Sequence, residues 1–446
     1  MKFVIFVLFL IVHSQLDDKL IFAMIHFRHG ARAPALINSN IDDNGEEWLI
    51  PGELTAVGER MHYLLGLRNR IRYIDEKKFL SEKFNSNELE VISTNVERTI
   101  ASLSSHLQGL YPQNEKLGRT LTNTQLNTSD PPFTLNNSKI IQEKNELDKC
   151  ALPNYMTIIP FKTMNIDGND YGSYVTTDFS DYVVAQNLQN ELNEKYKKNF
   201  DQLNGENNER NYTFYEGVFL CDSFIPNYID GRNLTQLKNT NLNFEEFYDF
   251  CIRILNETFS DLLPQKNKTL AYIQGSIPME LLVNYAKLRI DEDIKNISDN
   301  NGSSKKMLIV SGHDSTISAQ EIFIINSLGK NLEFYRYPTF ASQLTFEITR
   351  KDDKKSKRNY SDYFINYYFN EELLLNMTLS EFLDKMEPNI KTSDDNSNGN
   401  NNATQENNTN NNGNLANKNK FNNLPLISVA CLLALSLLLN LFYLIK

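Results

Sequence analysis

The hydrophobic positions of the central chain form short continuous runs, and each run is followed by a stretch with helical spacing. The runs occupy residues 19–27, 89–94 and 307–312. Apolar runs of this length are typical of strands that are covered on both faces. The helical stretches that follow them occupy residues 54–74, 96–110 and 315–328. This repeated order of strand, loop and helix predicts an α/β fold with a mostly parallel central sheet flanked by helices.

The remainder of the body shows two other patterns. Residues 341–349 and 363–369 alternate apolar and polar side chains, which predicts later strands towards an edge of the sheet. Residues from about 112 to 300 contain long polar loops and tyrosine-rich segments, together with the helical stretches 181–200 and 244–263. We interpret this range as a largely helical cap that covers the carboxyl edge of the sheet. The predicted domain spans residues 18–387, and its core segments are about 18–111 and 301–387.

Both ends of the chain are apolar, but the N-terminal segment predicts a signal peptide and the C-terminal segment a membrane anchor. Residues 1–15 combine one lysine, about ten apolar residues and a polar exit, which is typical of a secretory signal peptide and too short to span a bilayer. Residues 388–423 are rich in asparagine and contain almost no side chains that could pack, so we expect a disordered stalk. Residues 424–446, uncharged over 424–445, predict one C-terminal hydrophobic helix, which is either a transmembrane anchor or a glycolipid-anchor signal.

Export to the secretory pathway agrees with further features of the sequence. Sequons for N-glycosylation fit an exposed, exported surface, and they occur at Asn127, Asn136, Asn211, Asn233, Asn256, Asn267, Asn296, Asn359 and Asn376. Of the four cysteines, Cys431 lies in the anchor, and three remain. The simplest pairing is Cys221 with Cys251, with Cys150 free or paired between chains. The alternative is three buried thiols.

The overall charge limits the ligands that the chain can bind. There are 45 Lys and Arg against 56 Asp and Glu, and the net charge is −11. This balance has the wrong sign for a general nucleic-acid binder. Any bound anion must therefore meet a local cluster of positive charge. No cysteine pair has CxxC spacing, and His26 and His29 point to opposite faces of the first strand, so the sequence predicts no metal site and no cofactor.

Such a positive cluster is expected where the three predicted core strands end, because ligands of α/β sheets bind beyond the carboxyl ends of the strands. The residues that follow these ends are three arginines, two histidines and one aspartate: Arg28, His29, Arg32, Arg98, His313 and Asp314. Arginine binds phosphate oxygens with paired, charge-assisted hydrogen bonds. A neutral imidazole is a nucleophile, and a carboxyl group whose pKa is held up by a bound phosphate can protonate a leaving oxygen. Gly30 lets the backbone turn close to the ligand.

These residues lie in motifs that resemble the histidine acid phosphatase family, which is branch 2 of the histidine phosphatase superfamily. The motifs are RHGARAP at 28–34, STNVERTIAS at 93–102 and SGHDST at 311–316, supported by Leu54-Thr55-x-x-Gly58 and FASQLTFEI at 340–348. The resemblance implies a phosphoglycerate-mutase-like fold and a phosphohistidine on His29. It also implies a phosphate site of Arg28, Arg32, Arg98 and His313, with Asp314 as the proton donor. Secreted relatives usually carry more cysteines, and the segment around 379–382 lacks one.

The resemblance implies an acid phosphatase similar to the lysosomal and prostatic types. We expect it to act on small phosphomonoesters or phosphoproteins, without nucleic acid, in a lysosome-like or vacuolar lumen or at the cell surface, with a homodimer as one expected assembly. The alternatives are a narrower phosphatase for inositol phosphates or lysophosphatidate, and a stalked surface or adhesion protein with a residual phosphatase fold. Among the arginines, the pKa of His29 should be lowered, while protonated Asp314 should favour activity at acid pH.

Overall fold

The computed structural model describes most of the predicted domain. The described residues are 18–35, 48, 50–126, 128–132, 137–164, 183–203, 205, 210–232, 234–238, 240–265, 268–299, 302–331, 335–351 and 357–390. The chain divides into two units: the described residues belong to the first, Met1–Ser393, and the second, Asp394–Lys446, lies outside them. The predicted signal peptide, the stalk beyond residue 390 and the hydrophobic helix at 424–446 lie outside the described residues. Within those residues, no helix has both the length and the hydropathy needed to cross a bilayer.

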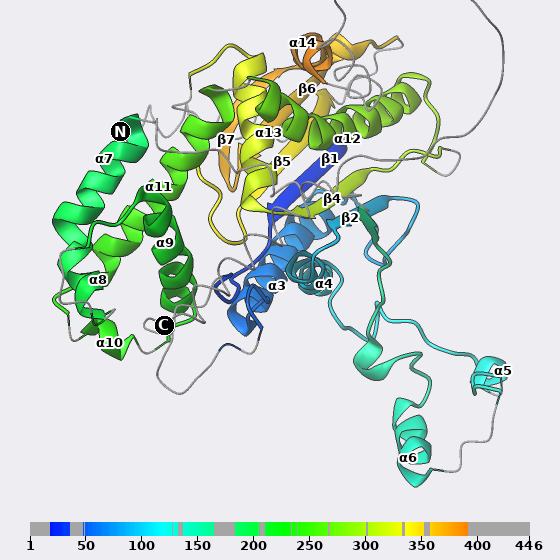
Figure 1. Cartoon of the computed structure of the whole chain (residues 1–446). Coiled ribbons are helices and arrows are strands. Elements are labelled where there is room, and N and C mark those ends of the chain that lie inside the picture. The colour runs from blue at the N-terminus through cyan, green and yellow to red at the C-terminus, as the bar shows by residue number, and fades with distance from the viewer. Residues whose placement is uncertain are drawn as a thin grey trace, which may run out of the picture. The chain divides into compact units, whose positions relative to one another are not determined.

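A seven-stranded sheet forms the centre of the first unit, in the order β3-β2-β4-β1-β5-β6-β7 (Figure 1). The strands are β1 (Asp18–Arg28), β2 (Leu89–Thr94), β3 (Lys162–Met164), β4 (Met307–Gly312), β5 (Gln343–Lys351), β6 (Tyr363–Phe369) and β7 (Glu372–Thr378). The three predicted core strands are confirmed as β1, β2 and β4, and they lie side by side. Their carboxyl ends therefore meet at one edge of the sheet, with Arg28 of β1 in register with Gly312 of β4.

The sheet is mixed, so the prediction of a mostly parallel sheet is only partly correct. β1 pairs in parallel with β4, β4 with β2 and β2 with β3. The pairs β1–β5, β5–β6 and β6–β7 are antiparallel. Antiparallel neighbours need only a short connection, whereas parallel neighbours need a crossover. Only Asn370 and Glu371 separate β6 from β7, and Asn370 has a φ of 52°, which makes this connection a tight turn.

Helices cover both faces of the sheet. Side chains along β1 alternate between the two faces, and both sets are apolar, so each face needs a covering layer. Ala23, Ile25 and Phe27 pack on one face, in a core with side chains of α3, η1 and α4. Phe22 and Met24 pack in the core on the other face, beneath α12, α13 and α14. These elements are α3 (Ala56–Arg70), the π-helix η1 (Ile71–Glu76), α4 (Glu97–Leu110), α12 (Lys268–Ile294), α13 (Asp314–Ser327) and α14 (Leu379–Met386).

α12 packs on the sheet although it lies within the range that the sequence assigned to the cap. Its buried residues are spaced along one helical face: Met279, Leu282, Val283, Ala286 and Ile290. The long loops that precede it carry short elements, and one of these, β3, joins the edge of the sheet. The remaining short elements are α5 (Asn123–Leu126), α6 (Ser138–Leu147), η2 (Pro153–Tyr155), η6 (Tyr360–Asp362) and η7 (Glu387–Asn389).

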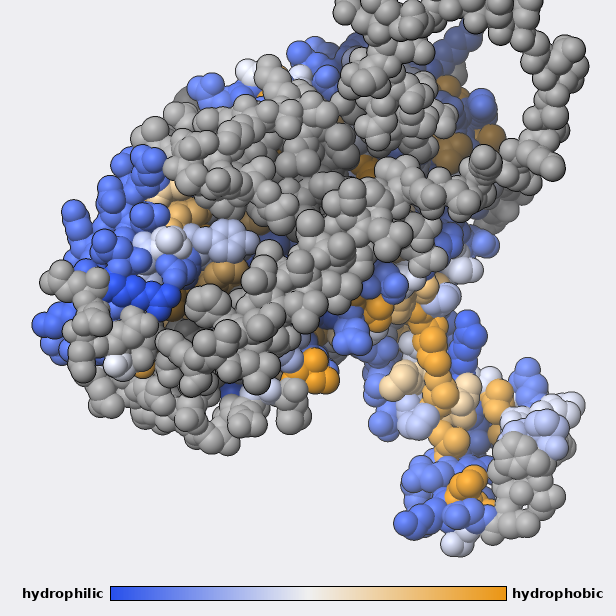
Figure 2. Space-filling view, in the orientation of Figure 1, coloured by the Kyte–Doolittle hydropathy of each residue, from blue (hydrophilic) through white to orange (hydrophobic). Residues whose placement is uncertain are grey.

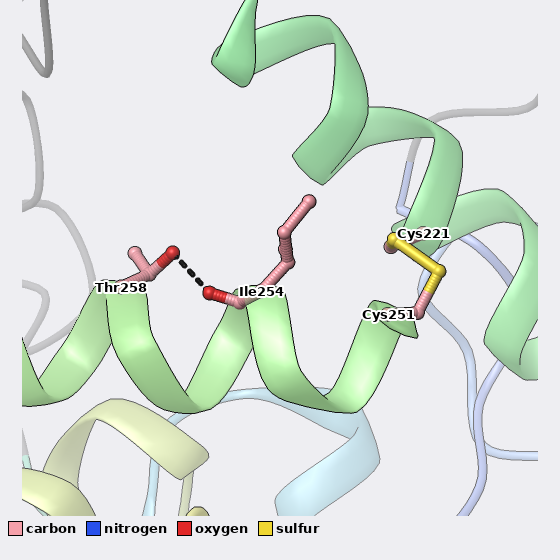
Figure 3. The surroundings of a disulfide bond; sticks show 4 residues. All are labelled: Cys221, Cys251, Ile254 and Thr258. Carbon is pink, nitrogen blue, oxygen red and sulfur yellow. Dashed lines mark hydrogen bonds between the residues drawn. A yellow bond between two sulfur atoms is a disulfide. The ribbon is translucent and has the colours of Figure 1, made fainter. Parts of the chain in front are cut away.

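The other cap helices form a second hydrophobic core, separate from the sheet. They are α7 (Val183–Glu191), the π-helix η4 (Leu192–Tyr196), α8 (Lys197–Leu203), α9 (Phe214–Ile229), α10 (Thr235–Lys238) and α11 (Phe244–Gln265). Phe224, Phe247 and Phe250 lie within this core, and hydrophilic residues cover the outer side of α7 and α8 (Figure 2). The predicted disulfide between Cys221 and Cys251 is confirmed and joins α9 to α11 (Figure 3). Among the described cysteines, Cys150 is the free one.

Candidate active site

The backbone after β1 is held against the first turn of α3. A Cβ atom on Gly30 would lie 2.5 Å from the carbonyl oxygen of Gly58, so only glycine permits this approach. Thr55, the N-cap of α3, donates from its backbone N–H and its hydroxyl to the carbonyl oxygen of Ala31, at 2.9 and 3.2 Å. These contacts give the Leu54-Thr55-x-x-Gly58 motif a structural role, because they fix the loop that carries His29 and Arg32.

His29 presents one defined nitrogen for chemistry. Its Nδ1 lies 2.9 Å from the carbonyl oxygen of Gly30, which can only accept a hydrogen bond. Nδ1 therefore carries the proton, and Nε2 keeps its lone pair. Burial, followed by the charges of Arg28 and Arg98, lowers the pKa of His29 well below its ordinary value. The imidazole is thus neutral at mildly acidic pH, as expected from the sequence.

Arg28 is held by four partners at the end of β1. Its Nη2 lies 2.8 Å from Oδ2 of Asp314. Its Nη1 donates to the carbonyl oxygen of Pro338 at 2.7 Å and to the hydroxyl of Tyr337 at 3.2 Å. The guanidinium also lies over the ring of Phe340, 4.4 Å from the ring centre. Its position is therefore set before any ligand binds.

Asp314 is the first residue of α13, and its carboxylate faces Arg28. Oδ1 accepts the backbone N–H of Ser315 at 2.8 Å, and Oδ2 accepts the hydroxyl of Tyr337 at 3.1 Å. Burial alone would raise the pKa of Asp314, but the charges of Arg28 and Arg32 outweigh it, so the pKa is lowered. The sequence predicts a raised pKa for Asp314 because of the negative charge of a bound phosphate. The protein's own charges act in the opposite direction.

His313 and Arg98 form the other side of the site. Arg98 can only donate, so the 3.2 Å contact between its Nη2 and Nδ1 of His313 makes Nδ1 the acceptor. Nε2 of His313 then carries the proton and donates to the Thr94 hydroxyl at 3.0 Å. The Thr94 hydroxyl lies 2.8 Å from the hydroxyl of Thr99. Burial and Arg98 lower the pKa of His313, so this ring is also neutral.

The structure brings all six predicted residues into one site. Arg28 contacts Asp314, the ring of His313 contacts both His29 and Arg98, and Arg32 lines the same cavity as Arg28 and Asp314. The rings of His29 and His313 meet edge to face, with centres 5.6 Å apart. Three guanidinium groups around a neutral imidazole can bind a tetrahedral oxyanion and present a nucleophile to it. Within the described ranges, no group of three His, Cys, Asp or Glu side chains can hold a metal ion.

The family model of the histidine phosphatase superfamily (branch 2) matches residues 19–370. The chain belongs to this superfamily. Lysosomal acid phosphatase of Xenopus laevis is 39% identical over 108 residues, which are 24% of each chain. Human prostatic acid phosphatase is 35% identical over 113 residues, 25% of this chain and 28% of that protein. The aligned parts thus span about a quarter of these curated relatives.

Solved structures of similar fold extend over more of the chain. The phytase of Hafnia alvei in complex with myo-inositol hexakis sulphate covers 83% of this chain and 87% of its own, with 16% identity and a TM-score of 0.49. The phytase of Citrobacter braakii covers 82% of this chain and 87% of its own, with 15% identity and a TM-score of 0.45.

Sequence reasoning missed three residues of the site of this histidine phosphatase. Asp222 of cap helix α9 accepts from Nη2 of Arg32 at 2.6 Å and from the backbone N–H of Ala35 at 2.9 Å. Tyr337 and Phe340 come from the loop before β5 and hold Arg28. None of the three follows a parallel strand, so the strand-end rule did not find them. Two signals could have indicated two of them. Asp222 directly follows Cys221, whose predicted disulfide would fix its position, and Phe340 begins the FASQLTFEI segment.

Proposed function

We propose that this chain is an acid phosphatase that hydrolyses phosphate monoesters through a phosphohistidine on His29. The observation that carries the proposal is the state of the His29 ring: neutral, protonated on Nδ1 and surrounded by Arg28, Arg32 and Arg98. Membership of the histidine phosphatase superfamily and the similarity to named acid phosphatases support it.

The first half of the reaction transfers the phosphoryl group to the protein. Arg28, Arg32 and Arg98 hold the phosphate oxygens beside the ring of His313, and Nε2 of His29 attacks phosphorus. The bond between phosphorus and the ester oxygen breaks as the new phosphorus–nitrogen bond forms. Protonated Asp314 gives its proton to the leaving oxygen, so an alcohol departs. Phosphate competes with Asp314 for Arg28 and adds negative charge, and both effects favour protonation of the carboxyl group.

The second half restores the enzyme. A water molecule attacks phosphorus, and the Asp314 carboxylate accepts its proton. The phosphorus–nitrogen bond breaks, inorganic phosphate leaves and His29 returns to the neutral ring. Because the first half needs protonated Asp314, the rate should fall as pH rises through the apparent pKa of this group.

The test follows the covalent intermediate. Alkaline quenching of the enzyme with labelled substrate preserves phosphohistidine, which is labile in acid. We expect label on the protein in the wild type and none in His29→Ala, whose activity should fall by at least ~10³-fold. A His29→Ala protein that turns over as fast as its parent would end this mechanism. Unchanged fluorescence of Trp48, the single tryptophan of the chain, serves as the folding control.

We also propose that the chain enters the secretory pathway as a glycoprotein and is tethered by residues 424–446, with the catalytic domain in a lysosome-like or vacuolar lumen or at the cell surface. The apolar N-terminal segment, the sequons and the names of the lysosomal relatives support this. A shift in mobility on treatment with an N-glycosidase is expected. Release of activity by a phosphatidylinositol-specific phospholipase indicates a glycolipid, whereas retention in membranes after that treatment indicates a transmembrane helix. Light scattering of the detergent-purified protein tests the homodimer.

A further inference from the structure

A cavity opens beside the phosphate-binding arginines, and the cap supplies most of its wall. Its volume is about 70 Å³, and Arg28, Arg32 and Asp314 are among the residues that line it. One water occupies roughly 10–15 Å³ by the same measure, so the cavity has room for a small organic group.

The wall of the cavity is apolar. α9 contributes Val218, Ile225 and Ile229, and α11 contributes Ile252 and Leu255. Hydroxyl groups of Tyr248, Tyr337 and Thr339 line other parts of the cavity. Against the five aliphatic side chains, a hydroxyl-rich or charged leaving group would lose water without gaining hydrogen bonds, which is unfavourable. An alkyl or aryl group gains the free energy of transfer out of water.

Charge at the cavity disfavours a second phosphate. Among the described residues that line it, the cations are Arg28 and Arg32. Asp222 already pairs with Arg32 at 2.6 Å and places a carboxylate at the same wall. A second phosphate on the leaving group would therefore meet hydrocarbon and negative charge instead of a free cation.

The wall is also fixed in position. The Cys221–Cys251 disulfide joins α9 to α11, and its two cysteines directly precede Asp222 and Ile252. The same disulfide thus holds both the Asp222 carboxylate and the apolar side chains of the wall in position. A preorganised wall binds its ligand without an ordering cost.

The geometry points to selection of one substrate class: phosphate monoesters whose leaving alcohol carries a single apolar alkyl or aryl group and no second phosphate. The wall formed by α9 and α11 binds the apolar group, and Asp222 is the residue that excludes polyphosphorylated substrates. This inference rests on the proposed phosphatase function of the same site.

The test compares kcat/KM for ethyl, butyl and hexyl phosphate with glycerol phosphate and butanediol bisphosphate. The alcohols of the alkyl series have similar intrinsic reactivity, so differences report binding in the cavity. We expect kcat/KM to rise about fourfold per methylene until the cavity is filled. Butyl phosphate should exceed both polar substrates by about tenfold or more.

Variants separate the two features of the wall. Ile225→Asn should flatten the alkyl series, whereas Phe219→Asn, an exposed position on the same helix, should leave it unchanged. Asp222→Asn should raise kcat/KM for the bisphosphate about tenfold relative to butyl phosphate. An unchanged ratio in Asp222→Asn would overturn the role of Asp222.

A binding measurement decides the inference independently of catalysis and of variant folding. Alkylphosphonates bind without being hydrolysed, and Trp48 reports on the cap because its Nε1 donates to Oδ1 of Asn227 in α9 at 3.1 Å. Affinity of the wild type that rises with alkyl length supports the inference, and equal affinity overturns it. If alkyl phosphates and p-nitrophenyl phosphate all remain unhydrolysed, the proposed function fails instead.

Discussion

At the scale of single residues, Asp314 shows how the protein and its ligand set one pKa together. The ion pair with Arg28 and the hydrogen bond from Tyr337 favour the carboxylate. The proposed reaction needs the carboxylic acid in its first half and the carboxylate in its second. A lowered pKa in the ligand-free protein is therefore compatible with an acid pH optimum. Activity is highest at a pH where part of the Asp314 population is protonated in the complex with substrate.

Replacing this carboxyl group should affect substrates according to their leaving groups. Asp314→Asn cannot donate a proton, so single-turnover release of an alkyl alcohol should slow by ~10²–10⁴-fold. Release of p-nitrophenol should slow much less, because p-nitrophenolate is a stable anion. Rapid-quench kinetics with butyl and p-nitrophenyl phosphate measure both rates, and His29→Ala is the inactive control. Equal slowing of the two substrates would contradict the assignment of Asp314 as proton donor.

At the scale of elements, the site depends on how closely neighbouring elements approach. The loop after β1 reaches α3 through the contact of Gly30 with Gly58. The cap reaches the same loop through the pair of Asp222 and Arg32. Both contacts join segments that are distant in sequence, and small displacements of either would move an arginine.

Adding one methyl group to the loop should therefore impair activity more than folding. Gly30→Ala places a Cβ atom 2.5 Å from the Gly58 carbonyl oxygen, so the loop must shift. We expect kcat/KM to fall by about 100-fold, the order of loss produced by a displacement near 1 Å. Gly217→Ala in α9 is the matched control, because its nearest neighbour is the flexible end of Leu192 at 3.0 Å. Steady-state kinetics and circular dichroism distinguish the two effects.

The disulfide should stabilise the cap to a predictable extent. It closes a loop of 30 residues, so the double variant Cys221→Ser with Cys251→Ser should lose about 3–4 kcal/mol of unfolding free energy on chain-entropy grounds. Urea denaturation followed by Trp48 fluorescence measures this loss. Cys150→Ser, which removes the free thiol, should leave the transition in place. A double variant as stable as the parent would show that packing between α9 and α11 suffices.

At the scale of the whole molecule, burial of histidine links stability to pH. Five of the six histidines are described, and all five are buried with lowered pKa values: His26, His29, His62, His106 and His313. Each stays neutral in the folded protein but binds a proton in the unfolded chain below its ordinary value near 6.5. Glu321 acts in the opposite direction, because burial raises its pKa well above the ordinary value. One such group does not offset five histidines.

Stability should therefore decrease as pH falls from 7 to 5. The unfolded state binds more protons over this window, so the unfolding free energy falls as the solution becomes more acidic. His26, with a pKa lowered to about 4, should alone account for about 2 kcal/mol at pH 5. Urea denaturation at several pH values measures the slope, and Glu321→Gln should steepen it by removing the opposing group. A constant or rising unfolding free energy would contradict this expectation.

Much of the core could be predicted because its signals are local. The strands at 89–94, 307–312 and 363–369 match β2, β4 and β6 to the residue, since continuous or alternating apolar side chains require a buried sheet. β7 was not predicted, because its side chains are exposed or half-exposed and leave no pattern of buried positions. It is recognisable as a strand only by its pairing with β6. α12 was assigned to the cap because its face towards the sheet is recognisable only once the sheet is present.

The sequence by itself predicted the core strands and the helices that follow them, the six residues at the strand ends, and Cys221–Cys251 as the simplest cysteine pairing. These follow from periodicity, from the rule that strand ends meet at one edge, and from spacing. Only the tertiary structure decided the antiparallel half of the sheet, the tautomer of His29 and the pairing of Asp222 with Arg32. Hydrogen bonds and ion pairs between distant segments depend on distances of a few ångströms, which local sequence patterns do not encode.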